Sequence, residues 1–473
     1  MTVAEVQAIR PAEGVRFALV LPVVIVGAGA AGLVAALAAR AAGAEVLVLE
    51  RDAVPRGSTA LSAGLVPAAG TRWQREAGIE DSPARFAADI SAKAHGEPDP
   101  ALVALVSREV GPALEWLHDA HGLPFSVIQD FRYPGHSALR MHGMPSRSGE
   151  ELVDRLRGAA EAAGVEILGG AQVLTLFADA AGRVRGVEYR RPDGATEQVG
   201  CDAIVLACNG YGGNKELVAR HVPELAEALY FGHAGNQGDA LRWGGALGAA
   251  LRDLSGHQGH GSVAHPAGIL ITWATITEGG VQVNAAGARF ADESRGYSEQ
   301  AAAVLEQPGG LAWTLFDARI AAVARQFEDF RQAEAIGAVL AAEDLAGLAA
   351  ATRLPAEALA ATLAEVAALK AAGGRDRFGR DFAGGPELVP PFRAVQVTGA
   401  LFHTQGGLAV DGDARVLGED GAALPNLFAA GGAAVGVSGR QASGYLSGNG
   451  LLTAVALGRV AGRAAARLAA ETA

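Results

Sequence analysis

The chain has little cysteine, little charge and no long uninterrupted hydrophobic run. Only two cysteines, Cys201 and Cys208, occur among its 473 residues. This excludes a disulfide framework, an iron–sulfur cluster and a haem attached through a Cys-x-x-Cys-His motif. The formal net charge of −12 argues against binding to nucleic acid and leaves no basic stripe for an anionic membrane. No histidine or cysteine spacing resembles a zinc site, so we expect no metal.

Signals for export or membrane insertion are also missing. The first twenty residues contain Glu5, Pro11 and Glu13 and have no long apolar core, and no uncharged run is long enough to span a bilayer. We therefore expect a soluble, cytoplasmic protein.

What is abundant is apolar side chains and glycine. Half of the residues are hydrophobic, 19% are charged and 64 are glycine, a composition typical of a compact α/β protein. Because 473 residues exceed what one hydrophobic core usually holds, we expect two domains, or one large domain with an insertion.

The most informative segment runs from Val23 to Arg51. Four apolar β-formers, residues 23–26, lead into Gly27-x-Gly29-x-x-Gly32, and a helical stretch and a second apolar strand follow, ending at Glu50. The first glycine allows a tight strand-to-helix turn, the second allows a pyrophosphate to approach, and the third allows close packing of the helix. The segment predicts dinucleotide binding, with Glu50 on the ribose; the alternative is an ordinary βαβ crossover.

Sequence character changes along the chain and then returns. Residues 165–206 are expected to form strands that end in a glycine-rich turn. Residues 256 to about 395 contain short strands and histidines, then an alanine-rich stretch, Ala318 to Ala372, predicted to be helical. From about residue 396, strand-and-glycine segments and a final helix resume. A dinucleotide-binding fold interrupted by a cap explains this return.

Several motifs together resemble the family of FAD-dependent fumarate reductases and 3-ketosteroid dehydrogenases. They are the opening fingerprint, GSTALSAG (57–64), ACNGYGGNKEL (207–217), NQGDALRWGGALGA (236–249), NLFAAGGAAVG (426–436) and SGNGLLTAVALGR (447–459). The resemblance implies an α/β fold with a Rossmann-like, glutathione-reductase-like FAD-binding domain, residues 1–255 and 396–473. An inserted α+β capping domain, residues 256–395, would bind substrate and contribute to catalysis.

The resemblance also implies a set of cofactor-binding residues. These are Gly27, Gly29, Ala30, Ala31, Gly32, Glu50, Arg51, Ser58, Thr59, Ser62, Gly64, Val173, Asn209, Gly210, Asp239, Gly431, Asn449, Leu451 and Leu452. Members with covalent flavin carry a histidine where this chain has Ser58, so we expect non-covalent FAD. The acid that usually follows Ala-Ala-Gly is Gly432 here.

Two tyrosines favour a ketone substrate. Tyr297 lies eight residues after the arginine of the Arg289-Phe-Ala-Asp-Glu segment, where fumarate reductases place arginine and ketosteroid dehydrogenases tyrosine. Tyr445 precedes the last helix, at a second position that differs between the two groups in the same way. The resemblance implies that Tyr297 removes the α-proton, that flavin N5 accepts the hydride, and that Tyr445 donates to the ketone oxygen.

Further residues are expected to assist this reaction. A free tyrosine has a pKa near 10, so Tyr297 needs a nearby cation or relay, for which Arg295 and Tyr133 are candidates. The backbone N–H of Asn449 or Gly450 would also support the enolate. Structural roles remain the alternative for both catalytic tyrosines.

A histidine pair favours an acid instead. His265-Pro266 and His403-Thr404 match histidines with which fumarate reductases hold a substrate carboxylate, so His265, His403, Thr404 and Asn449 are the predicted substrate-binding residues. A ketone that also carries a carboxylate, such as a ring keto acid, would reconcile both patterns.

Three functions therefore remain open. The first is a dehydrogenase that introduces a double bond next to a ketone, and the second is a fumarate-reductase-like reductase of an unsaturated acid. The third is a flavin-binding sensor without catalysis. For the enzymes, electrons would pass to an external acceptor, namely a quinone, another protein or oxygen.

Overall fold

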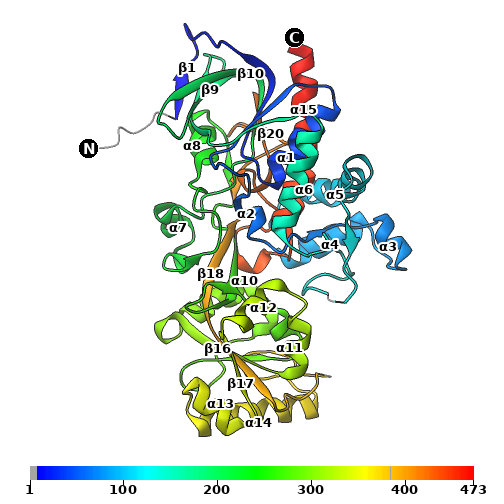
Figure 1. Cartoon of the computed structure of the whole chain (residues 1–473), viewed down its shortest axis with the longest axis vertical. Coiled ribbons are helices and arrows are strands. Elements are labelled where there is room, and N and C mark those ends of the chain that lie inside the picture. Colours follow the sequence, from blue (N-terminus) through cyan, green and yellow to red (C-terminus); the bar gives the residue numbers. More distant parts are fainter. Residues whose placement is uncertain (1–7, 131, 384, 473) are drawn as a thin grey trace, which may run out of the picture. The chain divides into compact units, whose positions relative to one another are not determined.

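The computed structural model describes residues 8–130, 132–383 and 385–472, which divide into two compact units. Unit 1 comprises the chain up to Val222, residues 232–257 and residues from His403 onward; unit 2 comprises residues 223–231 and 258–402. The chain can be followed in Figure 1. The predicted division placed the insertion at 256–395. Which unit binds the cofactor and which caps the substrate stays a prediction at this point.

Unit 1 is built on a sheet that the described residues make nine-stranded. The strands are β1 (Ile9–Pro11), β2 (Val20–Val26), β3 (Val46–Leu49), β7 (Glu166–Leu168), β8 (Gln172–Ala178), β9 (Val184–Arg190), β10 (Thr196–Leu206), β20 (Arg415–Leu417) and β21 (Ala423–Ala429). Strands β21, β10, β2, β3 and β7 are parallel neighbours, and β9 and β8 extend the sheet antiparallel from the first half of β10.

The parallel strands are apolar at nearly every position because both faces of the sheet are covered. Val23, Val24 and Ile25 of β2 are fully buried, and β3 is buried throughout. The helices of unit 1 are α1 (Ala30–Ala41), α2 (Gly57–Ala60), α3 (Arg72–Glu76), α4 (Pro83–Lys93), α5 (Pro100–His121), α6 (Gly149–Ala162), α7 (Lys215–His221), α8 (Asp239–Ala246) and α15 (Asn449–Thr472). Short strands β4 (Val66–Pro67), β5 (Ser126–Val127), β6 (Met141–Gly143), β12 (Leu251–Arg252) and β19 (Gly407–Leu408) complete it.

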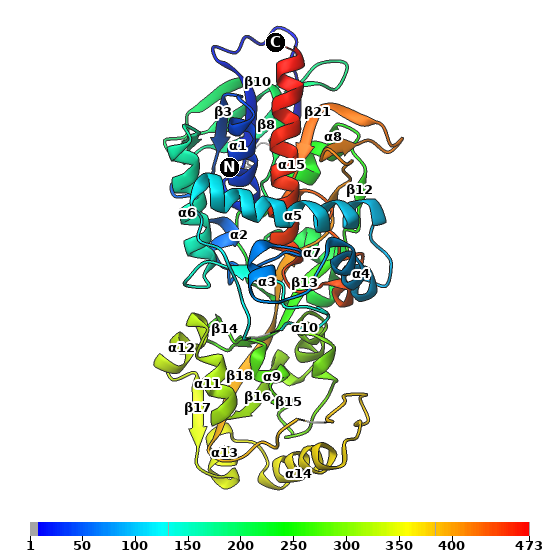
Figure 2. The same ribbon diagram turned by 90° about the vertical axis from the view of Figure 1, so that its right-hand side faces the viewer.

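Helices α1 and α15 lie side by side (Figure 2) and pack backbone to backbone. A Cβ on Gly458 would come within 2.7 Å of the Ala31 carbonyl oxygen, and one on Gly462 within 2.1 Å of that of Ala35. The contact advances by four residues on both helices, so the two run in the same direction. Their N-termini therefore face the same end of unit 1.

Unit 2 has a sheet with the order β14-β13-β18-β16-β15, to which β11 and β17 are added through β18. Its strands are β11 (Leu229–Tyr230), β13 (His257–Ala264), β14 (Ile269–Leu270), β15 (Val281–Val283), β16 (Leu311–Asp317), β17 (Val339–Ala342) and β18 (Phe392–Thr404). Its helices are α9 (Ala274–Thr277), α10 (Tyr297–Leu305), α11 (Ala318–Ala324), α12 (Glu328–Ala335), α13 (Leu345–Thr352) and α14 (Ala356–Ala372).

The alanine-rich stretch of unit 2 is not helical throughout, as the sequence had suggested. Strand β17 interrupts it and pairs antiparallel with β18, Val339 opposite Val395. Helix α12 ends just before Gly337, which adopts a φ of 77° that favours glycine. Alanine content indicated helix, but the β-branched Val339 and the available edge of β18 favour a strand.

Candidate functional site

The β2–α1 turn has the geometry that the glycine fingerprint requires. A Cβ on Gly27, whose φ is 103°, would approach the Ala207 carbonyl oxygen to 2.5 Å, and a Cβ on Gly32 would approach the Gly27 oxygen to 1.8 Å. Gly29 caps α1 and has only the Thr59 hydroxyl near its Cβ position, at 3.4 Å. The first turn of α1 is therefore open on the side of Gly29, and the N-terminus of a helix attracts an anion through its N–H groups and dipole.

Glu50 is held as an oriented acceptor at the end of β3. Its two carboxylate oxygens accept hydrogen bonds from the Ala28 N–H at 2.7 Å and the Asp52 N–H at 3.0 Å. Its carbonyl oxygen accepts from the Ala171 N–H at 2.7 Å, which brings the segment of Val173 to the same edge of the sheet. Each carboxylate oxygen keeps lone pairs for further donors such as ribose hydroxyls.

The loop around α2 is tied to the same turn. The Thr59 hydroxyl accepts from the Ala30 N–H at 3.0 Å, and the Ser62 hydroxyl donates to the Thr59 carbonyl at 2.7 Å and accepts from the Gly64 N–H. Ser58 accepts from the His233 N–H at 3.0 Å and from the Asn236 amide at 2.8 Å. Ser58 thus joins two loops that the sequence places 175 residues apart.

The remaining predicted cofactor residues of unit 1 frame these elements. Arg51 donates to the Gly235 carbonyl at 2.7 Å and pairs with Asp239, the first residue of α8, at 3.3 Å. Asn209, with a φ of 64°, follows β10 and accepts the Gly210 N–H. A Cβ on Gly431 would lie 2.9 Å from the Ala31 side chain, so the end of β21 meets the first turn of α1.

Helix α15 begins beyond this turn. Gly458 packs on Ala31, and Asn449 lies nine residues earlier, which at 1.5 Å per residue puts the start of α15 roughly 13 Å past that contact. Asn449 is fully buried and its Oδ1 has no partner among the described residues, while Leu451 and Leu452 continue the first turn. An anion site on α1 and an unpaired acceptor farther along, facing the same end, suit a long dinucleotide such as FAD.

His403 and Tyr445 lie together over the first turn of α15. The position that a Cβ would take on Gly450 is 3.9 Å from the His403 ring and 4.0 Å from the Tyr445 hydroxyl oxygen. Burial lowers the pKa of His403 to about 4, so its imidazole is neutral at physiological pH. The backbone N–H of Asn449 already donates to the Leu446 carbonyl at 3.0 Å. Support of the enolate by the backbone N–H of Asn449 or Gly450 stays a prediction.

Two smaller features complete this part of unit 1. The Thr404 hydroxyl is buried and accepts from the Tyr211 N–H at 3.3 Å. Gly432, which stands where the resembling family has an acid, leaves room for neighbouring side chains. A Cβ there would lie 2.2 Å from Asn209 Oδ1 and 2.8 Å from His403 Nε2.

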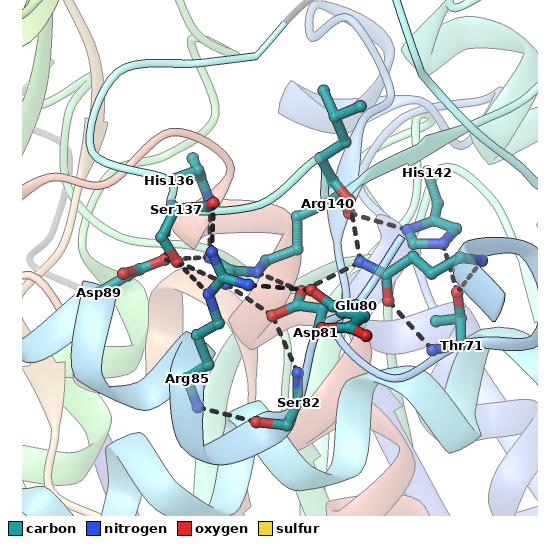
Figure 3. Close-up of polar contacts among 12 residues, drawn as sticks. Thr71, Glu80, Asp81, Ser82, Arg85, Asp89, His136, Ser137, Arg140 and His142 are labelled. Atoms are coloured by element: carbon teal, nitrogen blue, oxygen red, sulfur yellow. Dashed lines mark hydrogen bonds and ion pairs between the residues drawn. The ribbon is translucent and has the colours of Figure 1, made fainter. Parts of the chain in front are cut away.

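A buried ionic network surrounds Arg140 (Figure 3) and reaches the segment before α15 through His136. Arg140 contacts both oxygens of Asp81, at 2.7 and 2.9 Å, and Asp89 at 2.5 Å. Its guanidinium also reaches His136 Nδ1 at 3.2 Å, and His136 Nε2 donates to the Ser447 carbonyl at 2.9 Å. Burial lowers the pKa of His136 to about 4, so His136 is a neutral link between Arg140 and Ser447.

Tyr133 packs on apolar side chains near this network. It lies against the cluster of Leu65, Ile128 and Met141, and burial raises its pKa to about 12. Gly135 approaches the Leu446 side chain, which places the Tyr133 loop next to the Tyr445 segment. A phenol with a raised pKa is a poor proton acceptor near neutral pH.

In unit 2, Tyr297 opens α10 within an aromatic group. Its ring stacks on His260 at 4.7 Å between centroids and meets Trp273 edge-on at 6.2 Å. Burial lowers the pKa of His260 to about 3, and the indole N–H of Trp273 has no partner among the described residues. His265 is instead exposed in the turn after β13, and Arg295 is exposed as well.

Sequence reasoning did not single out His260 as the histidine beside Tyr297. The His-Pro pair drew attention to His265, whereas the distinguishing signal is the position of His260 within β13, whose residues are almost all buried. The segment before Tyr297 is fixed by Glu293, which pairs with Arg289 at 2.5 Å and with Arg380 at 3.1 Å and accepts from the Gln282 N–H. This network sets the start of α10.

Two kinds of feature are absent from residues 8–130, 132–383 and 385–472. No helix there is both long and apolar enough to cross a membrane. Nor do three or more His, Cys, Asp or Glu side chains gather there as metal ligands would.

The fold and the unit 1 site define a class: an FAD-binding protein with a Rossmann-like parallel sheet. Residues 22–451 match the family described as an FAD binding domain. A probable fumarate reductase, Ifc3, of Shewanella frigidimarina is 30% identical to the chain, over 94% of this chain and 74% of the relative. The 4-oxocyclohexanecarboxylate 2-dehydrogenase of Sinomonas cyclohexanicum is 27% identical, over 95% and 93%.

Solved structures agree. A flavocytochrome c3 fumarate reductase in its open conformation superposes with a TM-score of 0.81 at 29% identity, covering 96% of this chain and 79% of the other. The 3-ketosteroid-Δ4-(5α)-dehydrogenase of Rhodococcus jostii RHA1 gives 0.76 at 25%, covering 97% and 99%. The chain therefore belongs to the FAD-binding domain family. It is an FAD-dependent oxidoreductase acting on CH–CH groups, and the expected cofactor and fold class are confirmed.

Proposed function

We propose that the protein is a dehydrogenase that introduces a double bond next to the ketone of a ring keto acid. The observation that carries this proposal is that the Tyr445 hydroxyl and the neutral His403 imidazole both lie within 4.0 Å of the Cβ position of Gly450. A phenol and a neutral imidazole are donors suited to carbonyl and carboxylate oxygens. The similarity to a dehydrogenase of 4-oxocyclohexanecarboxylate, which carries both groups, supports the same substrate class.

Each residue has a task in this reaction. Tyr297 removes the α-proton, Tyr445 donates to the ketone oxygen as it gains negative charge, and His403 donates to the carboxylate. FAD, when bound, supplies the acceptor for the hydride that leaves the β-carbon. In unit 2 we assign His260 rather than the exposed His265 to the substrate, because His260 is buried against Tyr297.

The cofactor-binding residues follow from the same proposal. The first turn of α1 would hold the pyrophosphate, Glu50 the ribose, and the start of α15 with Asn449 the ring system. We expect FAD to be non-covalent, since Ser58 has no nucleophilic nitrogen and its oxygen already accepts two hydrogen bonds. Intact FAD should stay in solution after acid precipitation of the protein; flavin in the pellet would contradict this. A quinone, a protein or oxygen would then reoxidise it.

Reduction of an unsaturated carboxylic acid is the second candidate, favoured by the similarity to fumarate reductases. A dicarboxylate is usually held by guanidinium groups. Arg440, one candidate, has a side chain that is 74% exposed and pairs with Asp253. Arg295, the other, is exposed in unit 2. Neither position favours the acid reaction over the ketone reaction.

The test is the Tyr297→Phe variant. If Tyr297 is the base, kcat for the keto acid should fall by ~100-fold or more, the usual scale of general-base catalysis, while the flavin stays bound. Tyr189→Phe is the matched control, because Tyr189 bonds Glu197 at 2.7 Å on strand β9, and its activity should be unchanged. Near-normal ketone turnover by Tyr297→Phe, with an inactive Arg295→Ala, would favour the reductase.

A further inference from the structure

An uninterrupted chain of hydrogen bonds connects the first residue of α15 to His403. The Asn449 amide nitrogen donates to the Ser438 hydroxyl at 2.9 Å, and that hydroxyl donates to Gln405 Oε1 at 2.9 Å. The Gln405 amide nitrogen then meets His403 Nδ1 at 2.7 Å. Ser438, Gln405 and Asn449 are all at most 2% exposed. His403 lies near the end of β18 and Gln405 just after it, Ser438 lies in the loop after β21, and Asn449 begins α15. All four belong to unit 1, so folding of unit 1 assembles them.

The chain of hydrogen bonds has a direction, because a serine hydroxyl carries one proton and so donates only once. With Asn449 donating to Ser438, the hydroxyl proton goes to the Gln405 oxygen, and the Gln405 NH₂ must face His403. His403 Nδ1 then accepts, so its ring proton is on Nε2. At the other end, Asn449 exposes Oδ1, which is buried and has no partner within the described chain.

We infer that Gln405 and Ser438 are positioning residues that hold His403 in its Nε2–H tautomer, so that a neutral donor faces the substrate oxygen. This inference deepens the proposed function and rests on it for the identity of that oxygen. Burial, which lowers the pKa of His403 to about 4, keeps the donor uncharged. Asn449 Oδ1 is the matching acceptor for an N–H or O–H of a bound molecule.

The tautomer can be measured without turnover. Long-range proton–nitrogen NMR on protein labelled with ¹⁵N-histidine separates Nδ1–H from Nε2–H rings, and a His403→Gln sample assigns the signal among the 11 histidines. We expect a protonated Nε2 and a bare Nδ1 at pH 7. A protonated Nδ1 would mean that the chain runs in reverse, and would overturn the inference whatever the substrate is.

Variants test the function of the chain. Gln405→Met keeps the length of the side chain but cannot donate, and Gln405→Glu can only accept, which forces a proton onto His403 Nδ1. Both should raise KM for 4-oxocyclohexanecarboxylate at least about tenfold, the scale of a lost hydrogen bond to a charged group. KM for cyclohexanone, which has no carboxylate, and kcat for both substrates should change little. Gln332→Met, on the exposed side of α12, is the control.

Ser438→Ala gives a second, independent variant. It leaves Gln405 in place but removes the acceptor for Asn449, and it should raise KM in the same substrate-selective way. Ser443→Ala, which removes only a hydroxyl that donates to Gln441, should not. An Nε2–H signal in the wild type, together with an equal loss of kcat for both substrates in Gln405→Met, would contradict the proposed substrate but not the assigned tautomer. Equal KM values in wild type, Gln405→Met and Ser438→Ala would show that the chain does not position His403 for substrate.

Discussion

Unit 1 contains two buried polar networks that contact the chain between Ser438 and Asn449, and they are built in opposite ways. The Arg140 network is ionic and closed, meaning that its charged groups bond one another. Arg140 donates to Asp81 and Asp89, and His136 donates to the Ser447 carbonyl. The network of Asn449, Ser438, Gln405 and His403 is neutral and open at both ends. A closed ionic network fixes a backbone, whereas an open neutral network leaves a donor and an acceptor for a bound molecule.

The difference follows from the cost of burying charge. A buried carboxylate is tolerated only when hydrogen bonds and a counter-charge replace its water. The charged groups of the Arg140 network therefore bond one another and leave none to bind a ligand. A buried neutral amide or hydroxyl costs less free energy than a buried charged group when one of its hydrogen bonds is missing. The side chains next to the predicted site of the flavin ring therefore belong to the neutral network. Those that hold the backbone behind it belong to the ionic network.

The largest effect should come from breaking the closed network. Arg140→Met leaves the buried carboxylate of Asp81 and the partly exposed carboxylate of Asp89 without their counter-charge, which should lower the free energy of unfolding by ~3–5 kcal/mol. Arg85→Met removes a neighbouring but exposed arginine that bonds Ser137 (Figure 3), and should cost less than ~1 kcal/mol. Urea unfolding of both variants provides the measurement. Equal midpoints would show that the closed network does not stabilise the fold.

An intermediate effect is expected where the open network meets Gly432. In Gly432→Ala, the new methyl group would overlap Asn209 Oδ1 and His403 Nε2 and should displace the imidazole. We expect a tenfold to hundredfold loss of kcat/KM for the keto acid, about 1.4–2.8 kcal/mol, with little change in stability. Gly245→Ala in α8, where nothing lies within 4 Å of the Cβ position, is the control. Unchanged steady-state kinetics in Gly432→Ala would contradict the assignment of His403 to the substrate site.

The most gradual effect, smallest near neutral pH, is that of pH on stability. The pKa values of His136, His142 and His403 are lowered to about 4, below the ~6.5 of an unfolded histidine. The unfolded state therefore binds more protons in this range, and the free energy of unfolding should decrease as the pH falls from about 6.5 toward 4.

Asp89 contributes at still lower pH. Burial raises its pKa, but hydrogen bonds from Ser137 and Arg140 bring it below the ordinary value, so its stabilisation is lost only as the pH falls through that lowered pKa. Urea midpoints at pH 8, 6.5 and 5 should fall in that order, with the larger decrease between pH 6.5 and 5. His142→Gln should weaken this dependence and His95→Gln, at an exposed position, should not. A midpoint independent of pH down to 5 would contradict the neutral histidines.

How far the sequence predicted this arrangement depends on how local the signal was. The β2–α1–β3 unit followed from adjacent residues, since Gly27, Gly32 and Glu50 act within one supersecondary structure. Strand β17 was not predicted because its pairing with β18 is a tertiary effect that overrides the helix propensity of alanine. The fold class and the cofactor were nevertheless within reach of motif reasoning, and the family match confirms them.

The site was only partly predictable. His403, Tyr445 and Tyr297 stood out through their motifs, and their roles stay proposals. Gln405 and Ser438 carry no motif: 33 residues separate them, and only the fold brings them within 2.9 Å. His260 was passed over in favour of His265, because burial in a strand cannot be told from a turn by residue type alone.

The central claim is that a ketone, held together with a carboxylate, is the oxidisable substrate. Anaerobic mixing of the FAD-loaded protein with 4-oxocyclohexanecarboxylate, cyclohexanone, cyclohexanecarboxylate and succinate, followed by flavin absorbance, tests it most directly. We predict rapid bleaching by the keto acid, slower bleaching by cyclohexanone, and none by the two compounds without a ketone. Bleaching by succinate, together with reoxidation of the reduced flavin by fumarate and no response to either ketone, would contradict the account.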